Sequence, residues 1–530
     1  MLARTVAALA ACGTALSASA QLRQVETTRT APATQAAALG DVVTGRAALE
    51  RLGDQLASKA SEFGVSEGQL AATIMRDRSL YVRDDLAMMY ACDRAPANLD
   101  APNARIVVDD EGNQFAGRGG DIPLDDFLSL SSRPSATRVI YLDFDGHFST
   151  GNSWGHSINF PAYNTQGSTA SFTDQEKADI IAHWQEVVED FAPFNVNVTT
   201  QDPGTAALRR TSSGDVNYGM RVVMTQVVPG FVNAGGVALL NTFASSTDTP
   251  CFAFNKGLGA GPMTVSHEVG HTFGLFHDGL SGSEYHPGSS GGGASSWGPI
   301  MGAPFGRNIV QWSNGDYPGR TTTQNDIAIM GNSLNGVTAL PDDITNDLFP
   351  GQPAELDVQY SGVISSGSDI DVFGISLEEA TDIRVVAESA PVGENVDVKV
   401  EVWRFAPSFG LIATIDPTNT PDVDEVVSLD AGDYSFAVEG SFQSLNNGPV
   451  SNYGSIGTYT LRLEEQLPPE PITVSFPDGV PSTLAEGVPT EITIQIDPGT
   501  NTVDLSRSSM NFGIDGPAIG VAPLVPAGGD

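Results

Sequence analysis

The sequence has few basic residues, few cysteines and no long internal apolar run. Of its 530 residues, 26 are Lys or Arg and 64 are Asp or Glu, giving a formal net charge of −38. Nucleic acid and anionic membranes repel such a chain, so we expect neither as a partner. No internal apolar run reaches the ~20 residues of a membrane-spanning helix, so we expect no transmembrane span. A chain of this length should fold as several domains.

The N-terminus resembles an export signal. Arg4 supplies positive charge, a largely apolar run follows, and residues 18–20 are the small residues Ala, Ser and Ala. This pattern predicts a signal peptide over residues 1–20, with Gln21 as the first residue of a secreted, extracellular chain. Cys12 ends a stretch that resembles a bacterial lipobox, so lipid anchoring there is the alternative.

One stretch concentrates metal-binding chemistry. His267 and His271 lie four residues apart, so on a helix they share one face and can hold one ion. Gly274 has no Cβ and lets the helix end in a turn that brings His277 round as a third ligand. Three protein ligands leave a fourth zinc position for water, as in catalytic zinc sites. Glu268 is placed to act on that water without being a ligand.

An accidental match is improbable because the chain has only seven histidines. We put the chance of such a match at roughly one in 10⁵. The mechanism expected from these residues is hydrolysis by a zinc-bound water, which Glu268 deprotonates as it attacks a peptide carbonyl. The substrate is then a protein or peptide, and we expect the enzyme to be a monomer.

The motif resembles that of the metzincin zinc endopeptidases, with Asp278 after the third histidine as in adamalysin-like (reprolysin-like) members. The clan needs a methionine-bearing turn beneath the metal, and residues 297–302 resemble that turn, with Met301 as its methionine. The resemblance covers residues 140–335, and the later segments resemble bacterial secreted members. It implies an α+β catalytic domain with a twisted mixed sheet, a long helix and the zinc helix.

Cys92 and Cys251 remain after export, and an even count favours a disulfide between them. The alternative is a zymogen switch, in which the Cys92 thiolate occupies the open zinc position. Asp93 could do the same as a carboxylate ligand, and the sequence leaves these possibilities open.

The upstream segment, residues 21–130, is expected to be a helical pro-region with helices at 44–52 and 66–75. Residues 110–133 are polar and glycine-bearing, like an accessible linker, and predict maturation between Arg118 and Arg138.

The protease domain is expected over residues 131–340. Strands are predicted at 138–144, 194–200 and 221–228, and a helix at 174–191 capped by Thr173 or Asp174. The segment 235–240 is expected to be a sheet edge along the cleft, to which an extended peptide could add. Of the other histidines, only His286, in the loop 281–296, is a candidate to lie near the metal.

Residues 345–466 alternate as strands and suit a β-sandwich that resembles a pre-peptidase C-terminal domain. Asp369 and Asp371 are candidate calcium ligands, with solvated turn carboxylates as the alternative. Residues 472–530 start a further β-module that we expect to be incomplete.

The leading hypothesis is a secreted zinc endopeptidase made as a zymogen. The runner-up is a non-catalytic adhesion or matrix-binding protein with a structural zinc, against which Glu268 argues because a structural site needs no general base. A zinc hydrolase acting on non-peptide bonds is the third reading.

Overall fold

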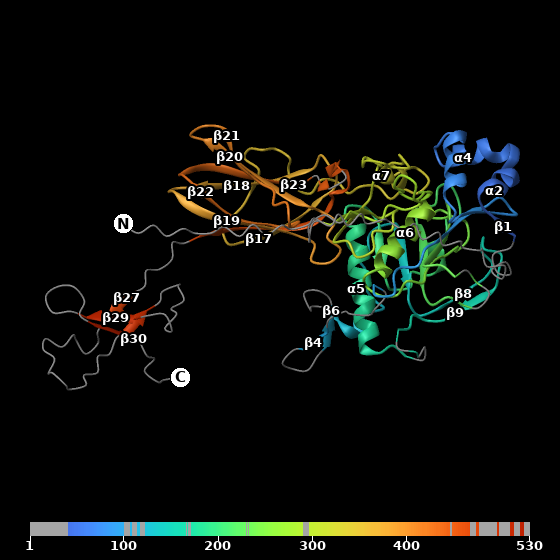
Figure 1. The fold of residues 1–530 in the computed structure, drawn as a ribbon, viewed down its shortest axis with the longest axis horizontal. Coiled ribbons are helices and arrows are strands. Elements are labelled where there is room, and N and C mark those ends of the chain that lie inside the picture. The colour runs from blue at the N-terminus through green and yellow to red at the C-terminus, as the bar shows by residue number, and fades with distance from the viewer. Residues whose placement is uncertain are drawn as a thin grey trace, which may run out of the picture.

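The computed structural model describes residues 41–99 and 122–466, apart from gaps at 166, 168–170, 229–230, 232, 290–295, 442 and 446–447, together with strands β4, β5 and β27–β30. The predicted signal peptide, Cys12, Arg118 and most of the module at 472–530 lie outside these residues. The described chain is a mixed α/β, β-rich protein with many sheets and few helices (Figure 1). A site-bearing part and a β-sandwich are its two main bodies.

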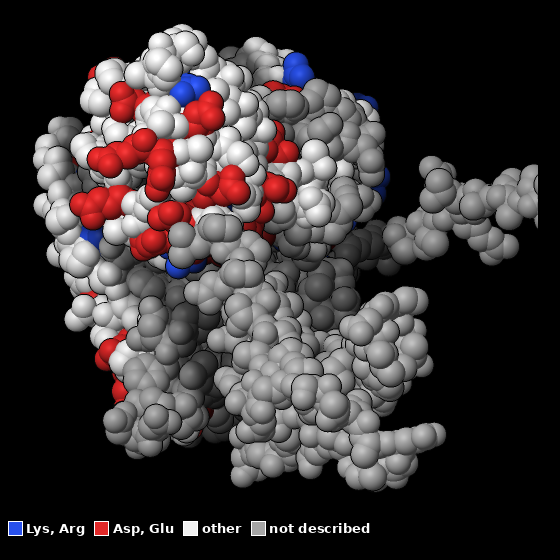
Figure 2. All heavy atoms as spheres, turned by 90° about the vertical axis from the view of Figure 1, so that its left-hand side faces the viewer, with Lys and Arg blue, Asp and Glu red and all other residues white. Residues whose placement is uncertain are grey.

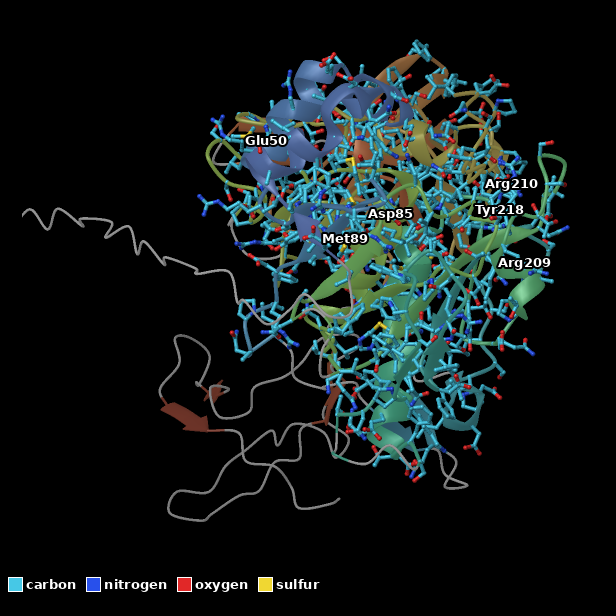
Figure 3. The ribbon with its side chains drawn as sticks, turned by 90° about the vertical axis from the view of Figure 1, so that its right-hand side faces the viewer. Glu50, Asp85, Met89, Arg209, Arg210 and Tyr218 are labelled. Carbon is cyan, nitrogen blue, oxygen red and sulfur yellow. The ribbon has the colours of Figure 1, made fainter. Side chains whose placement is uncertain are left out.

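An eight-stranded mixed sheet forms the site-bearing part, in the order β1-β2-β3-β12-β13-β11-β7-β10. Strands β7, β10, β11 and β13 run parallel, whereas β12, β3, β2 and β1 pair antiparallel in turn. Figure 3 shows Met89 of β3 and Tyr218 of β11 at separate places across this sheet. The bounds are β1 (Val42–Val43), β2 (Leu80–Arg83), β3 (Met88–Cys92), β7 (Arg138–Asp143), β10 (Asn197–Thr199), β11 (Tyr218–Met224), β12 (Gly236–Leu239) and β13 (Cys251–Ala253).

Two helices pack together beside this sheet. The long helix α5 (Asp174–Asp190) is capped by Thr173, whose side chain forms a capping box with Glu176, so the predicted helix and its cap are confirmed. Helix α6 (Gly261–Phe273) contacts α5 and strands β11, β12 and β13. The other helices are α2 (Gly45–Leu52), α3 (Leu56–Glu62), α4 (Glu67–Arg76) and the short α7 (Asp326–Met330).

The upstream segment is not only helical. The predicted helices are present as α2 and α4, but between Leu80 and Cys92 the chain forms the hairpin β2–β3, which extends the main sheet. The expectation that 235–240 is a sheet edge is therefore wrong for this structure, because β3 pairs with β12 along its length. The helices and hairpin bury a shared apolar cluster with Leu240 and Phe276 of the site-bearing part.

The remaining sheets have two or three strands each. Their strands are β4 (Ile106–Val108), β5 (Gln114–Ala116), β6 (Ile122–Pro123), β8 (His147–Ser149), β9 (Ile158–Phe160), β14 (Trp297–Pro299), β15 (Ile309–Gln311), β24 (Gln443–Leu445) and β25 (Gly448–Val450). In the last segment the described strands are β27 (Thr473–Ser475), β28 (Gln495–Asp497), β29 (Ser509–Phe512) and β30 (Gly520–Pro523).

A two-sheet β-sandwich follows the site-bearing part. One sheet has the order β16-β18-β23-β20-β21 and the other β17-β26-β19-β22. Buried and exposed residues alternate along strands such as β19, as expected when one face of a strand packs on a core. The bounds are β16 (Gln352–Pro353), β17 (Gln359–Ile364), β18 (Ile370–Leu377), β19 (Thr381–Ser389), β20 (Val398–Ala406), β21 (Gly410–Ile415), β22 (Val423–Leu429), β23 (Gly432–Gly440) and β26 (Gly457–Glu465).

The far end of the sandwich presents many acidic side chains and few basic ones (Figure 2). At the opposite end the sandwich packs on helix α5, and one apolar core runs through both bodies. Glu189 of α5 accepts hydrogen bonds from the Thr458 backbone N–H and hydroxyl, both at 2.7 Å. Asn395 donates its amide to Asp190 at 3.1 Å. The two bodies therefore meet through buried carboxylates.

Burial raises the pKa of Glu189 to about 8, against the lowering effect of its Thr458 bonds. Because the folded pKa lies above the unfolded value of ~4.3, this group stabilises the fold below pH ~4 and loses that contribution as the pH rises to about 8. Glu189→Gln should remove this loss, so the variant should unfold at a higher temperature than wild type at pH 8–9. Thermal unfolding from pH 5 to 9 tests this, and parallel curves for both proteins would contradict it.

Candidate metal centre

Helix α6 places the first two histidines. His267 and His271 lie one turn apart, and both are buried. The helix ends at Gly274, whose φ of 102° is a left-handed conformation that favours glycine. A Cβ there would also stand 2.3 Å from the Asn241 amide oxygen. This turn carries the chain back to His277, which is 2 % exposed.

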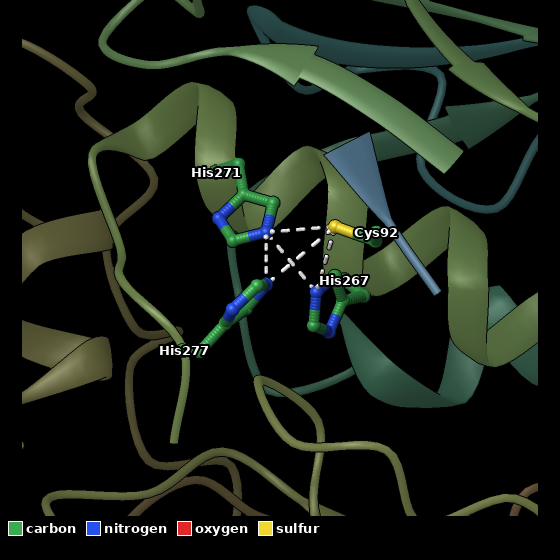
Figure 4. A group of neighbouring side chains, drawn as sticks. All are labelled: Cys92, His267, His271 and His277. Carbon is green, nitrogen blue, oxygen red and sulfur yellow. Dashed lines mark hydrogen bonds between the residues drawn. The ribbon is translucent and has the colours of Figure 1, made fainter. Parts of the chain in front are cut away.

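Four donor atoms meet at one point (Figure 4). The His271 Nε2 atom lies 3.0 Å from that of His267 and 3.2 Å from that of His277. The Cys92 Sγ atom, on β3, lies 3.5, 3.4 and 3.5 Å from the Nε2 atoms of His267, His271 and His277. The structure thus brings together the three predicted histidines and Cys92.

The other ring nitrogens fix the tautomers. His267 Nδ1 lies 2.8 Å from the Ile300 carbonyl, and His271 Nδ1 lies 2.8 Å from that of Leu275. His277 Nδ1 lies 2.8 Å from the Asp77 carboxylate. Carbonyls and carboxylates only accept, so each Nδ1 carries the proton and each Nε2 presents a lone pair.

Lone pairs that converge in this way repel one another unless a cation lies between them. Tetrahedral zinc, with Zn–N of about 2.0 Å and Zn–S of about 2.3 Å, sets its ligand atoms roughly 3.3–3.6 Å apart. The observed separations lie close to this range. The donor set, three imidazoles and a thiol, is one that zinc prefers. These residues therefore fit a zinc ion.

Burial decides the charges around this centre. It lowers the pKa of His267 to about 3 and that of His271 well below its ordinary value, so both rings are neutral, as ligands must be. Burial, and then the nearby Glu268, raise the pKa of the Cys92 thiol. Burial also raises the pKa of Glu268, against a lowering effect of its contact with Cys92. Only a bound cation would turn this thiol into a thiolate.

Met301 lies where the sequence predicted, in the turn beside the histidine helix. It is fully buried, and its carbonyl accepts a hydrogen bond from the Asp278 N–H at 2.8 Å. The preceding carbonyl, of Ile300, holds His267. Gly270 makes room for the thioether, because a Cβ at Gly270 would stand 2.4 Å from the Met301 Sδ atom.

The predicted disulfide is wrong, since Cys92 and Cys251 are both free and buried. Strand β12 lies between β3 and β13, so the two cysteines sit two strands apart, about 10 Å. A disulfide needs Cα atoms within ~7 Å. Cys251 Sγ instead contacts the Arg221 carbonyl.

Other candidates lie outside the cluster. Asp93 has an exposed side chain and follows Cys92 along a small cavity, and His286 packs on Trp297 and Tyr317. In the sandwich, Asp369 accepts hydrogen bonds from Ser365, whereas Asp371 groups with Asp342 and Asp343. Calcium binding there stays a prediction.

Sequence reasoning missed two residues of the centre, both from the upstream segment. Asp77 accepts from His277, and the Tyr90 ring stacks on His271 with centroids 4.1 Å apart. Tyr90 stands two residues before Cys92 and therefore points to the same face of β3, which was the available signal. Nothing local to Asp77 indicated its partner 200 residues away.

Gly270→Ala tests the packing beneath the histidines. The new Cβ would collide with Met301 Sδ, so we expect a loss of roughly 1–3 kcal/mol in the free energy of unfolding. Gly68→Ala, in α4, is the matched control, because a Cβ there meets nothing within 4 Å and should stabilise the helix by ~0.5–1 kcal/mol. Denaturant unfolding measures both, and equal effects would refute the close contact.

Within the described residues, no helix has the length and apolarity to cross a membrane. No curated protein matches the sequence at a significant level. Among solved structures, the pre-peptidase C-terminal domain of a Bacillus anthracis collagenase is 16 % identical, with a TM-score of 0.17, covering 21 % of this chain and 93 % of that one. The lysozyme inhibitor PliG of Aeromonas hydrophila is 16 % identical, with a TM-score of 0.16, covering 22 % of this chain and 95 % of that one.

TM-scores this low carry no information on function. Residues 180–278 match the model of the reprolysin-like metallopeptidases, family M12B. The matched segment holds all three histidines, and the cluster of three histidines and one cysteine has the character of a zinc site. The resemblance recognised from the sequence is therefore confirmed: residues 180–278 are similar to the reprolysin-like metallopeptidases of family M12B.

Proposed function

We propose that this chain is a secreted zinc endopeptidase, made as a zymogen, with Glu268 as its general base. One observation carries the proposal: three histidines of the reprolysin-like motif converge with a thiol from an upstream strand. Three protein ligands make a catalytic site, and the fourth donor closes it. The latent state would use all four donor atoms, and the active site only those of the three histidines.

A bound zinc ion would polarise the peptide carbonyl and make water acidic enough to react near neutral pH. The chain supplies the proton transfer. Glu268 follows His267 on α6, is fully buried, and lines the same small cavity as Cys92. It would take a proton from the attacking water and pass it to the leaving amine. The buried surroundings that raise the pKa of Glu268 favour this acceptance of a proton.

The hairpin β2–β3 accounts for latency. In β3, the Cys92 carbonyl accepts from the Gly235 N–H at 2.8 Å and the Met88 carbonyl from the Leu240 N–H at 2.9 Å. An extended substrate would need these backbone groups, at the two ends of β12, to add as a further strand. The cavity beside the cluster, about 10 Å³, holds about one water molecule and no substrate side chain.

The finer parts of the proposal rest on the sequence. Secretion is inferred from the signal pattern at residues 1–20, and maturation is placed between Arg118 and Arg138. The substrate is a protein or peptide, as the metallopeptidase family implies. We propose a metzincin-type catalytic domain over 131–340 that works as a monomer.

A second candidate is a non-catalytic adhesion or matrix-binding protein. The fourth donor, Cys92, favours it, because four protein ligands are typical of structural zinc sites. Against it stands the buried Glu268, which a structural site would not use. After removal of the upstream segment, chelator-sensitive cleavage of casein supports the protease, and its absence supports the binding protein.

Glu268→Gln keeps the size of the side chain and removes the base. We expect zinc content to stay at one per chain while peptide hydrolysis falls by about 10²–10⁴-fold. The measurement is hydrolysis by the processed enzyme together with metal analysis. Retained activity would remove Glu268 from this role, and lost zinc would place it in the structure of the site instead.

Cys92→Ala tests latency. Without the thiol, we expect activity to appear earlier during limited proteolysis, because the fourth position no longer has to be vacated. Cys251→Ala is the matched control, as this residue is also a buried free cysteine but lies on β13 and outside the donor cluster. The control should lower the unfolding temperature and leave the lag unchanged. Equal lags for wild type and Cys92→Ala would refute a thiol switch.

A further inference from the structure

We propose that Asp77 is a positioning residue for His277, so that the upstream segment holds the metal centre at two points, Cys92 and Asp77. The inference rests on the proposed zinc function and deepens its regulation. It predicts that the latent chain binds zinc more tightly than the processed chain does, and that the loss of the Cys92 ligand explains only part of this difference in affinity. Release of the segment would then both open the centre and loosen its metal.

The three histidines differ in where their orienting partners come from. His267 and His271 donate to carbonyls of Ile300 and Leu275, which belong to the site-bearing part and remain after any maturation. His277 donates to the Asp77 carboxylate, at 2.8 Å, with both side chains about 1–3 % exposed. Of the three rings, only His277 therefore has its hydrogen-bond acceptor in the segment expected to be removed.

A carboxylate is also the stronger partner. Its charge makes the hydrogen bond from an imidazole N–H stronger than one to a neutral carbonyl. Such a partner fixes the ring plane and keeps the proton on Nδ1, so that Nε2 is left to bind the metal. The Asp77 bond therefore acts on metal binding through His277, and Asp77 itself touches no metal.

Asp77 is held in place by its own segment. It ends helix α4, and its carboxylate accepts from the Ser79 N–H at 3.1 Å and from the Tyr90 hydroxyl at 3.0 Å. The Tyr90 ring lies 4.0 Å from the His277 ring and 4.1 Å from that of His271. The hairpin thus positions the carboxylate, two imidazole planes and the Cys92 thiol as one unit.

The same turn also engages the site-bearing part. Glu284 accepts from the Arg78 N–H at 2.9 Å and the Ser79 hydroxyl at 3.3 Å, while Tyr285 donates to the Ser79 hydroxyl at 3.1 Å. The Tyr285 ring lies 4.2 Å from His277. When the segment leaves, His277 loses its hydrogen-bond acceptor Asp77. Glu284 and Tyr285 lose their hydrogen bonds to the same turn, so the contacts that hold His277 in place become fewer.

The test is zinc affinity in the full-length chain, measured by competition with a chromophoric chelator. Glu268→Gln serves as the background, to prevent self-cleavage. In that background, Asp77→Asn keeps the side-chain size and removes the charge, and should weaken zinc binding about 10–100-fold. Asp85→Asn is the matched control: it changes a carboxylate of the same hairpin that is half exposed and pairs with Arg83. Its zinc affinity should equal that of the background.

A second readout separates positioning from a structural role. Zinc raises the unfolding temperature of a chain that binds it only when folded. Asp77→Asn should shrink this zinc-induced rise while leaving the metal-free unfolding temperature near that of the background. A merely structural Asp77 would lower both temperatures by the same amount, and that result would overturn the inference.

A milder variant guards against misfolding of Asp77→Asn. Tyr90→Phe keeps the stacked ring and removes one hydrogen bond to Asp77, so its zinc affinity should fall between those of Asp85→Asn and Asp77→Asn. If Asp77→Asn does not fold, a Tyr90→Phe affinity equal to that of Asp85→Asn overturns the inference. Where both fold, unchanged zinc affinity in Asp77→Asn overturns it.

The outcomes are distinguishable from failure of the proposed function. A background chain that binds zinc, with Asp77→Asn equally tight, overturns the Asp77 inference and leaves the protease proposal standing. A weakened Asp77→Asn together with a processed wild-type enzyme that cleaves no peptide overturns the protease and leaves Asp77 in its role. A chain that binds no zinc overturns both.

Discussion

Each imidazole of the cluster is tied through Nδ1 to an acceptor that has no proton to give, and this constraint decides what the centre can do. It leaves three Nε2 lone pairs facing a common point, an arrangement that is unfavourable without a cation. The bond from His271 to Leu275 spans four residues, so the turn after α6 orients that ring, whereas the bond from His267 to Ile300 spans 33 residues and depends on the Met301 turn packing beside α6. The buried surroundings lower the pKa values of His267 and His271, so these two rings are neutral, as metal ligands must be.

The parts of this centre that are local in the chain could be predicted from the sequence. His267, His271, Gly274 and His277 fall within one helix and one turn, where periodicity alone decides the geometry. Met301 could be placed only by resemblance, since its contact with Gly270 depends on tertiary packing. The helix of residues 174–191 was predictable because its apolar face and its cap both depend on residues close together in the chain.

The missing parts are non-local. Nothing in the residues around Asp77 or Cys92 specifies a partner in α6, and the pairing of β3 with β12 joins segments about 145 residues apart in the chain. Register between distant strands is set by what both faces bury. The contact between α5 and the sandwich could not be predicted for a related reason. A glutamate such as Glu189 on an amphipathic helix suggests a solvated face, yet Glu189 is buried against Thr458.

The antiparallel pairing of β3 with β12 has a consequence for how the proposed latency would end. While the chain is intact, β3 is tethered, and its effective concentration at β12 is set by the connecting chain. A single cut in that connection breaks none of the hydrogen bonds or apolar contacts that hold the hairpin. It turns the hairpin into a separate ligand, whose occupancy then depends on dilution and on its own rate of departure.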